Sequence, residues 1–219
     1  MKRPVSKSED KLRKQIEALE KENNHLKSLL LTDELTGLYN KRFFYIQLEV
    51  ETSRARRTGQ PCTLMMMDVD NFKLVNDTLG HDAGDQFLIQ IGDIIKNDLR
   101  VTDFACRFGG DEFSAIMPAS GINDSFTIAK RIQSSVAKLA STLHSDIKEH
   151  LSASFGLATY EAHAPISVAD FFRQSDLELY HAKKMGKNQI SCDRARGIVT
   201  TALSAEEKAA LARNITNIR

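Results

Sequence analysis

The sequence predicts an α+β domain with a ferredoxin-like, mixed antiparallel sheet flanked by helices and preceded by an N-terminal coiled-coil helix. Three observations lead to this prediction. Residues 6–30 contain no Gly or Pro and repeat apolar side chains at coiled-coil spacing. From residue 32 to 193, short apolar runs alternate with longer segments of helical period. Gly109 and Gly110 join two apolar runs, which favours an antiparallel hairpin and excludes a wholly parallel sheet.

The N-terminal helix is expected to pair two copies of the chain. Leu at the d positions and one Asn at an a position favour a parallel dimer. The alternative is a single amphipathic helix lying on its own domain. The chain is therefore divided into a helix (1–31), a domain (32–193) and a tail (194–219) in which Ser204 and Glu207 begin a short helix. The d positions are Leu12, Leu19 and Leu26, and the a positions are Ile16, Asn23 and Leu30.

Four helices and four strands are expected in the domain. The order strand, helix, strand, strand, helix, strand is that of a ferredoxin-like sheet, which carries its helices on one face. The two-residue link at Gly109 and Gly110 is expected to need positive φ angles. The predicted helices cover residues 41–58, 83–98, 124–143 and 170–185, and the predicted strands cover residues 62–68, 103–107, 112–117 and 152–160.

Composition excludes several classes of function. Lys and Arg total 30 against 29 Asp and Glu, so the net charge of +1 gives no field that would hold a nucleic acid. Three cysteines lack the spacing of a disulfide framework or a zinc site, which favours reduced thiols in the cytoplasm. The longest apolar run, residues 64–67, is too short to cross a bilayer, so any membrane anchor is expected outside this sequence.

Acidic residues stand at two places where chemistry is expected. Asp68 and Asp70 follow the apolar run of residues 64–67, and carboxylates at a strand end suit Mg²⁺ held together with substrate phosphates. Asp70 taken alone is better explained as the cap of the following helix. Asp111 and Glu112 follow the glycine link, where an ordinary solvated hairpin is an equally good explanation. Three converging carboxylates would raise one another's pKa, so a divalent cation explains them economically.

Two polar segments have side chains suited to a nucleotide. The Asn and Asp side chains of residues 76–85 can read the edge of a guanine, although turn chemistry is the simpler explanation for this segment alone. Residues 183–187 (KKMGK) stand at the end of a predicted helix, where their basic side chains complement the helix dipole or bind phosphate.

Together these residues resemble the GGDEF-domain family, the diguanylate cyclases. The resemblance rests on four ordered motifs, at residues 33–40 (DELTGLYN), 68–85, 109–113 (GGDEF) and 180–188. It implies a palm-type fold, two GTP as substrates, cyclic di-GMP and pyrophosphate as products, and Mg²⁺ or Mn²⁺ as cofactor. Because each domain would hold one GTP, it also implies a homodimer, which the N-terminal coiled coil would form. Family members commonly carry an upstream sensor or receiver domain, which we expect to be absent from this chain.

The resemblance implies a role for each site residue. Asp68 and Asp111 would bind the metal through their side chains, Val69 through its carbonyl, and Glu112 beside them. Asp111 would also accept the proton of the attacking 3′-hydroxyl. Substrate binding would fall to Phe72, to Lys73 as the phosphate-stabilising lysine, to Asn76 and Asp85 at the guanine, and to Lys183 and Lys187 at the terminal phosphates.

A second nucleotide site is implied by Arg100 and Asp103, which match the family's inhibitory RxxD motif and would bind the product. The alternative is a surface ion pair.

Three other functions stay open: an inactive domain that binds cyclic di-GMP, an enzyme making mixed cyclic dinucleotides, and a coiled-coil interaction module. The intact Asp68 and Asp111 argue against an inactive domain, and Asp85 argues against an enzyme making mixed cyclic dinucleotides. The ordered acidic motifs argue against a coiled-coil interaction module.

Overall fold

The computed structural model describes residues 13, 15–16, 31–143 and 150–192. The predicted coiled coil lies outside the described residues except for residues 13, 15 and 16, and the predicted tail helix lies wholly outside them. Among the described residues, no helix combines the length and apolar character needed to cross a membrane.

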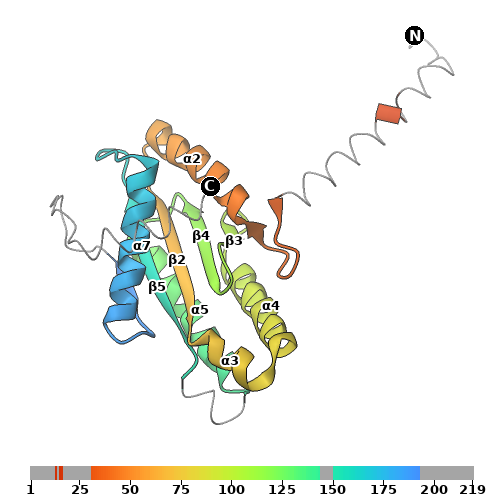
Figure 1. The fold of residues 1–219 in the computed structure, drawn as a ribbon. Helices are drawn as coiled ribbons and strands as arrows, with labels where there is room; N and C mark the ends of the chain where they lie inside the picture. Colours follow the sequence, from red (N-terminus) through yellow and green to blue (C-terminus); the bar gives the residue numbers. More distant parts are fainter. Residues whose placement is uncertain (1–12, 14, 17–30, 144–149, 193–219) are drawn as a thin grey trace.

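A six-stranded sheet forms the centre of the described domain (Figure 1). Its order is β1-β3-β4-β2-β5-β6. The central strand β2 pairs antiparallel with β4 and β5, and β3 pairs antiparallel with β4, while both edge pairs are parallel. The predicted mixed antiparallel sheet is thus confirmed. The strands are β1 (Tyr39–Asn40), β2 (Cys62–Asp70), β3 (Phe104–Arg107), β4 (Glu112–Pro118), β5 (Ser152–Tyr160) and β6 (Ile190–Cys192).

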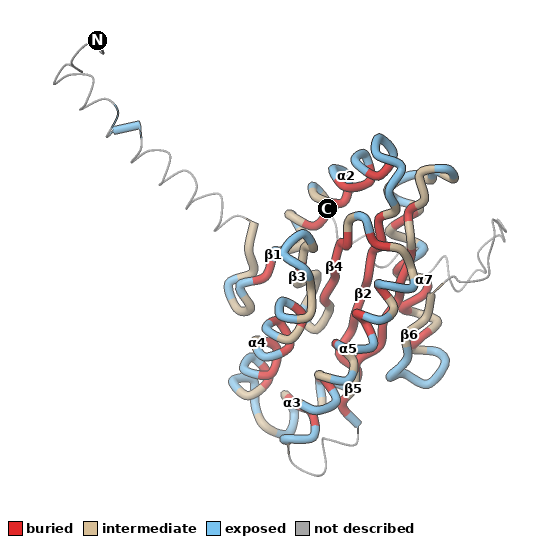
Figure 2. Tube along the Cα trace, turned by 180° about the vertical axis from the view of Figure 1, so that it is seen from behind, coloured by how far each residue is buried: buried red, intermediate tan, exposed pale blue. Residues whose placement is uncertain are grey.

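Helices cover both faces of this sheet, so the prediction of helices on one face is wrong. Side chains of β2 alternate between two separate buried apolar clusters: Met65 and Met67 pack with α4 and α5, whereas Leu64 and Met66 pack with α2 and α7. A continuous apolar run such as residues 64–67 is typical of a strand buried on both faces, as the red tube of β2 in Figure 2 shows. The helices are α2 (Lys41–Thr58), α3 (Phe72–Leu79), α4 (His81–Asp98), α5 (Ile122–Ala140) and α7 (Val168–Lys184).

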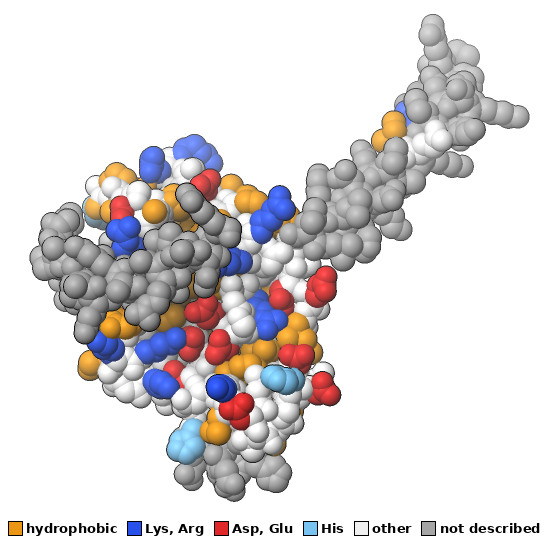
Figure 3. Space-filling view, viewed as in Figure 1, with side chains coloured by type: hydrophobic (Ala, Val, Ile, Leu, Met, Phe, Trp, Pro, Cys, Tyr) orange, Lys and Arg blue, Asp and Glu red, His pale blue; other side chains and the backbone are white. Residues whose placement is uncertain are grey.

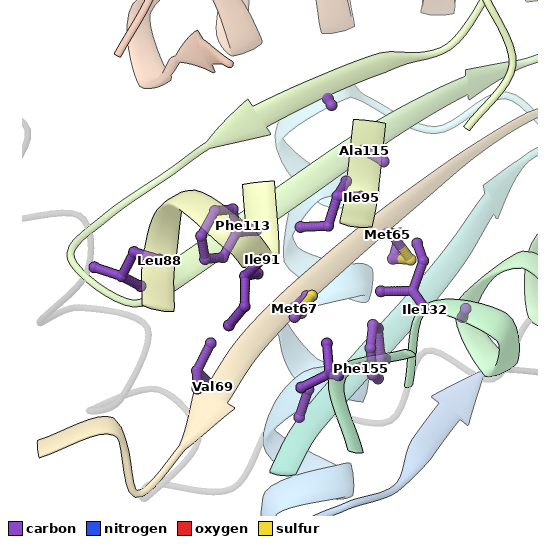
Figure 4. Packing of buried hydrophobic residues seen from close by; sticks show 14 of the residues in the cluster. Met65, Met67, Val69, Leu88, Ile91, Ile95, Phe113, Ala115, Ile132 and Phe155 are labelled. Carbon is purple, nitrogen blue, oxygen red and sulfur yellow. The ribbon is translucent and has the colours of Figure 1, made fainter. Parts of the chain in front are cut away.

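The first apolar cluster supports the end of β2 from which the acids project (Figure 4). Met67 of β2 lies between its cross-strand partners Phe113 of β4 and Phe155 of β5, and all three are fully buried. Ile91 of α4 and Ile132 of α5 pack in the same cluster. Close packing of this kind leaves little freedom to the strand, so the residues that follow it are held in fixed positions.

Local signals set most element boundaries. The helix at 41–58 and the strand at 152–160 have their predicted bounds. The side chain of Asn40 accepts a hydrogen bond from the backbone N of Phe43 at 3.1 Å and starts α2, and Gly59 at φ 75° ends it. The other predicted elements are present with one or both ends shifted by one to three residues. The strands β1 and β6 are not predicted, and α3 is anticipated only as the helix that Asp70 is expected to cap.

Helix α7 approaches β5 very closely at one glycine. A Cβ atom on Gly156 would lie 2.1 Å from the backbone N of Leu179 and 2.2 Å from the backbone O of Ser175. Only glycine allows this contact, because any side chain would meet helix backbone. The contact sets the depth of α7 on the sheet and, with it, the position of Lys183 near the helix end.

Candidate active site

The carboxyl end of β2 and the start of β4 bring acidic residues together. Asp68 and Glu112 are direct cross-strand partners. The backbone N of Val69 donates to the backbone O of Asp111 at 3.1 Å, so the turn before β4 lies against the end of β2. Lys183 reaches the same place from α7, and its Nζ lies 2.7 Å from Asp68 Oδ2. Figure 3 shows acidic and basic side chains close together on this side of the molecule.

Burial dominates the electrostatics of this cluster. Asp68 is only 9% exposed, and burial raises its pKa; the ammonium of Lys183 opposes that rise, while the charges of Asp111 and Asp70 add to it. Burial also raises the pKa of Glu112, and the neighbouring charges of Asp68 and Asp111 raise it further. The repulsion expected among these acids is therefore present, and Lys183 is a cation that offsets it.

Whether the residues suit a metal ion depends on their donors and their arrangement. Within residues 31–143 and 150–192, no three His, Cys, Asp or Glu side chains form a group that could hold one. The donor chemistry nevertheless fits a hard divalent cation, since Asp68 and Glu112 offer carboxylate oxygens and Asp68 already attracts the ammonium of Lys183. The metal-ligand roles of Asp68, Val69, Asp111 and Glu112 stay predictions.

The connection that carries the glycine pair differs from the predicted two-residue link. The antiparallel pairing of β3 and β4 is confirmed, but the connection spans residues 108–111 and neither glycine has a positive φ. The backbone N atoms of Phe108 and Gly109 both donate to the backbone O of Glu112, at 2.8 and 3.1 Å. A Cβ on Gly109 would instead lie 2.7 Å from Glu112 Oε2, at the flexible end of that side chain, so a larger residue there would displace the Glu112 carboxylate.

Arg107 connects this turn to the motif at residues 33–40, a role that the sequence reasoning missed. Its Nε and Nη2 donate to the backbone O of Gly110 at 3.2 and 2.8 Å, and its Nη1 lies 3.1 Å from Asp33 Oδ1. Burial alone would raise the pKa of Asp33, but hydrogen bonds from Thr36 and Arg107 outweigh it and the pKa is lowered. An arginine two positions before the glycine pair was the available signal.

The expected guanine-reading residues come from two successive helices. Asn76 lies in α3 and Asp85 in the first half of α4, and the chain turns between the helices at Gly80, φ 86°. Asn76 lies directly against Gly84, since a Cβ at that glycine would be 1.9 Å from Asn76 Oδ1. The structure therefore brings Asn76 beside the residue that precedes Asp85.

Phe72 and Lys73, both at the start of α3, differ in what they can offer a substrate. The ring of Phe72 packs in the core, stacked on Phe87 with centroids 6.5 Å apart, and the residue is 9% exposed. Any substrate contact of Phe72 must therefore come chiefly from its backbone. Lys73 is exposed on α3 and free to face solvent or a phosphate.

Asp70 does not cap α3, so that interpretation is wrong. The cap position is Asn71, which makes no side-chain capping bond, and Asp70 is 1% exposed. Its carboxylate instead accepts hydrogen bonds from β5 and from residue 188. Lys187 reaches the same end of β2, because its Nζ donates to Asn71 Oδ1 at 2.7 Å. Both expected phosphate-binding lysines, Lys183 and Lys187, thus lie at the end of β2.

Arg100 and Asp103 lie at the opposite end of β3 from the 108–111 turn. Asp103 Oδ2 accepts a hydrogen bond from the backbone N of Arg100 at 2.9 Å, whereas Oδ1 is buried without a hydrogen-bond partner. Burial raises the pKa of Asp103. Both residues line a pocket of about 440 Å³ together with Tyr39 and Lys96. The carboxylate therefore binds backbone here, and the pocket beside it offers room for a ligand.

Comparison with known proteins supports the resemblance. The family described as "Diguanylate cyclase, GGDEF domain" matches residues 30–189. The response regulator PleD of Caulobacter vibrioides is 34% identical over 168 residues, which cover 76% of this chain and 37% of PleD. The diguanylate cyclase DosC of Escherichia coli is 35% identical over 165 residues, which cover 74% of this chain and 35% of DosC. The chain thus spans roughly a third of the length of these curated relatives.

Solved structures give the same result. The coiled coil and GGDEF domain of DgcB from Caulobacter crescentus, in complex with c-di-GMP, aligns with a TM-score of 0.72 at 26% identity, covering 85% of this chain and 100% of that one. The active GGEEF domain of a diguanylate cyclase from Vibrio cholerae aligns with a TM-score of 0.65 at 29% identity, covering 72% of this chain and 98% of that one. With the motifs and the sheet topology, these matches establish that the chain belongs to the GGDEF-domain family of diguanylate cyclases.

Proposed function

We propose that this chain is a diguanylate cyclase that condenses two GTP into cyclic di-GMP. The 3′-oxygen of each GTP attacks the α-phosphorus of the other, so two phosphodiester bonds form and two pyrophosphates leave. The observation that carries the proposal is the meeting of Asp68, Glu112 and Lys183 at the end of β2, where acids and a base from three elements adjoin. Such a site can hold a cation and a polyphosphate together.

Each residue of the site has a defined part in this reaction. Asp68, Asp111, Glu112 and the carbonyl of Val69 would hold Mg²⁺ or Mn²⁺, which supplies charge for the phosphoryl oxygens and the departing pyrophosphate. Asp111 accepts the proton of the 3′-hydroxyl. The substrate itself is bound by the backbone of Phe72, by Lys73, Lys183 and Lys187 at the phosphates, and by Asn76 and Asp85 at the guanine.

Family resemblance and the geometry of the reaction both call for two copies. One domain holds one GTP, so two domains must face each other, and the segment 6–30 would raise their effective concentration as a parallel coiled coil. Removing residues 1–30 should lower specific activity most at low protein concentration. Equal specific activity of both forms across a dilution series would eliminate this role. We propose the cytoplasm as the site of the reaction, since GTP is a soluble substrate and Cys62, Cys106 and Cys192 are free thiols.

Product inhibition is proposed at Arg100 and Asp103. The adjoining pocket of about 440 Å³ supports this assignment, since it is lined by Asp103, whose buried Oδ1 has no hydrogen-bond partner. A carboxylate can accept hydrogen bonds from a guanine edge, and a guanidinium can pair with a phosphate. Arg100→Ala should abolish tight retention of cyclic di-GMP; unchanged affinity would place the retained product elsewhere.

The test of the activity is incubation with GTP and Mg²⁺ followed by chromatographic identification of cyclic di-GMP. Asp111→Ala should reduce product formation by orders of magnitude. Glu49→Ala, which removes an exposed carboxylate of α2, is the matched control and should retain full activity. Binding of cyclic di-GMP without turnover by the unmodified chain would favour an effector domain instead.

A further inference from the structure

Asp70 is a buried carboxylate that accepts hydrogen bonds from three donors. It is the last residue of β2 and is 1% exposed. Ser152 Oγ donates to Oδ2 at 2.7 Å, Ser154 Oγ donates to Oδ1 and Oδ2 at 2.8 and 3.0 Å, and the backbone N of Asn188 donates to Oδ2 at 3.0 Å. A buried carboxylate is tolerated only with such partners, so these bonds define where each partner lies.

The partner that leaves the sheet, Asn188, belongs to a strained connection between α7 and β6. Gly186, Lys187 and Asn188 all have positive φ angles, at 111°, 63° and 50°. For lysine this conformation is unfavourable, and asparagine tolerates it better, so the turn persists where the surroundings hold it. Three contacts hold the backbone of Lys187 and Asn188. Asp70 accepts from the backbone N of Asn188, Gln133 Nε2 donates to the backbone O of Asn188 at 2.9 Å, and the backbone N of Lys187 donates to the backbone O of Ala182 at 3.2 Å.

Asn71 binds the Lys187 side chain of the same connection. Its Oδ1 accepts from Lys187 Nζ at 2.7 Å, and its Nδ2 donates to the backbone O of His150 at 2.7 Å. Asn71 itself has φ 59°. Successive residues at the end of β2 therefore hold the backbone of residue 188 and the ammonium of residue 187, and Lys187 faces the start of α3 where Lys73 stands.

We propose that Asp70 is a positioning residue that fixes the Lys187–Asn188 turn and so places the Lys187 ammonium where the terminal phosphates of a nucleoside triphosphate bind. The inference rests on the proposed phosphate-binding role of Lys187. Without the carboxylate, the backbone N of Asn188 loses its acceptor, the left-handed turn loses a holder, and Lys187 is free to leave Asn71. Asp70 thus acts through Lys187 and does not touch the substrate.

The experiment compares affinity for a non-condensing guanosine triphosphate analogue with affinity for GMP, by calorimetry below the unfolding temperature. Lys187→Met should weaken the triphosphate analogue about 10-fold or more, because a charge-assisted hydrogen bond is lost. Asp70→Ala should weaken it about 5–10-fold and leave GMP within 2-fold. Asp70→Ala added to Lys187→Met should have almost no further effect, because the two act through one contact.

Two variants separate positioning from general damage. Asp70→Asn should restore most of the triphosphate affinity, since its amide oxygen can accept from the backbone N of Asn188 while its amide group donates to a serine hydroxyl. Thr63→Val removes buried hydrogen bonds at the other end of β2 and should leave the triphosphate affinity unchanged. Amide hydrogen exchange at Asn188 should accelerate in Asp70→Ala and not in Thr63→Val.

The outcomes distinguish the inference from its premise. If Lys187→Met leaves the triphosphate affinity unchanged, the phosphate role of Lys187 fails and the inference fails with it. If Lys187→Met weakens the analogue but Asp70→Ala does not, or if Asp70→Ala weakens GMP equally, Asp70 is a core anchor and only the inference fails. A full additional loss in the double variant would also overturn it.

Discussion

The close approach of α7 to β5 at Gly156 makes Gly156→Ala a severe test of the fold. The new Cβ would lie 2.1 Å from Leu179 N, 2.2 Å from Ser175 O and 2.7 Å from Leu179 Cα, whereas ordinary contacts begin at 3.4 Å. All three atoms belong to helix backbone, so no side-chain rotation relieves the clash. The helix must retreat by more than an ångström.

The expected magnitude follows from the rigidity of these neighbours. Overpacking a core typically destabilises by 1–3 kcal/mol, and a clash with backbone places Gly156→Ala at about 3 kcal/mol or above. For a domain of this size, 1 kcal/mol lowers the melting temperature by about 2–4 °C, so a fall of roughly 6–12 °C is expected. Activity should fall as well, since α7 carries Lys183.

Thermal unfolding followed by circular dichroism measures this effect. Gly121→Ala is the matched control, because no atom lies within 4 Å of its added Cβ and its φ of −87° suits any residue. The control should lose under about 1 kcal/mol, the scale of an N-cap change. If Gly156→Ala melts within the range of the control, the packing of α7 described here is wrong.

Three further changes have outcomes that the structure defines. Gly84→Ala should displace the flexible side chain of Asn76, raising the KM for GTP several-fold with little loss of stability. Because the pKa of Asp33 is lowered in the folded protein, the stability advantage over Asp33→Asn should be present above about pH 4 and fade as the pH falls through the folded-state pKa. Burial raises the pKa of both Cys62 and Cys106 to about 12, so neither should react with thiol reagents at pH 8 until the protein unfolds.

For each of these three predictions, one result would contradict it. An unchanged KM in Gly84→Ala would show that Asn76 takes no part in substrate binding. A stability gap for Asp33→Asn that widens on acidification would contradict the hydrogen bonds assigned to the carboxylate. Rapid labelling of Cys62 or Cys106 in the native protein, measured by mass spectrometry of the labelled peptides, would contradict their burial.

Most of the fold could be predicted because its elements carry strong local patterns. The 18-residue helix α2 has a capping Asn40 and a terminal Gly59, and β5 is a nine-residue run without a charged residue or a proline. The short elements β1, α3 and β6 depend on tertiary pairing and leave no periodic signal. Placing all helices on one face failed because the continuous apolar run of β2 was not used as evidence for burial on both faces.

The candidate site was predictable as a set of residues but not as a geometry. Acids after an apolar strand indicate a cation site, yet only the register of β2 and β4 places Asp68 opposite Glu112. The partners of Asp70 come from residues 82 to 118 positions away, so a local capping rule could not find them. The contact of Gly109 is likewise spatial, since a Cβ there would meet the Glu112 carboxylate, and its backbone has no positive φ.

The central claim is that this domain converts two GTP into one cyclic di-GMP. It is tested most directly by incubating the purified chain with GTP and Mg²⁺ and quantifying cyclic di-GMP and pyrophosphate in the same sample by chromatography with mass spectrometry. The proposed reaction predicts two pyrophosphates for each cyclic di-GMP, and product formation lower by orders of magnitude in Asp111→Ala. Absence of cyclic di-GMP from the unmodified chain, or equal product from Asp111→Ala, would contradict it.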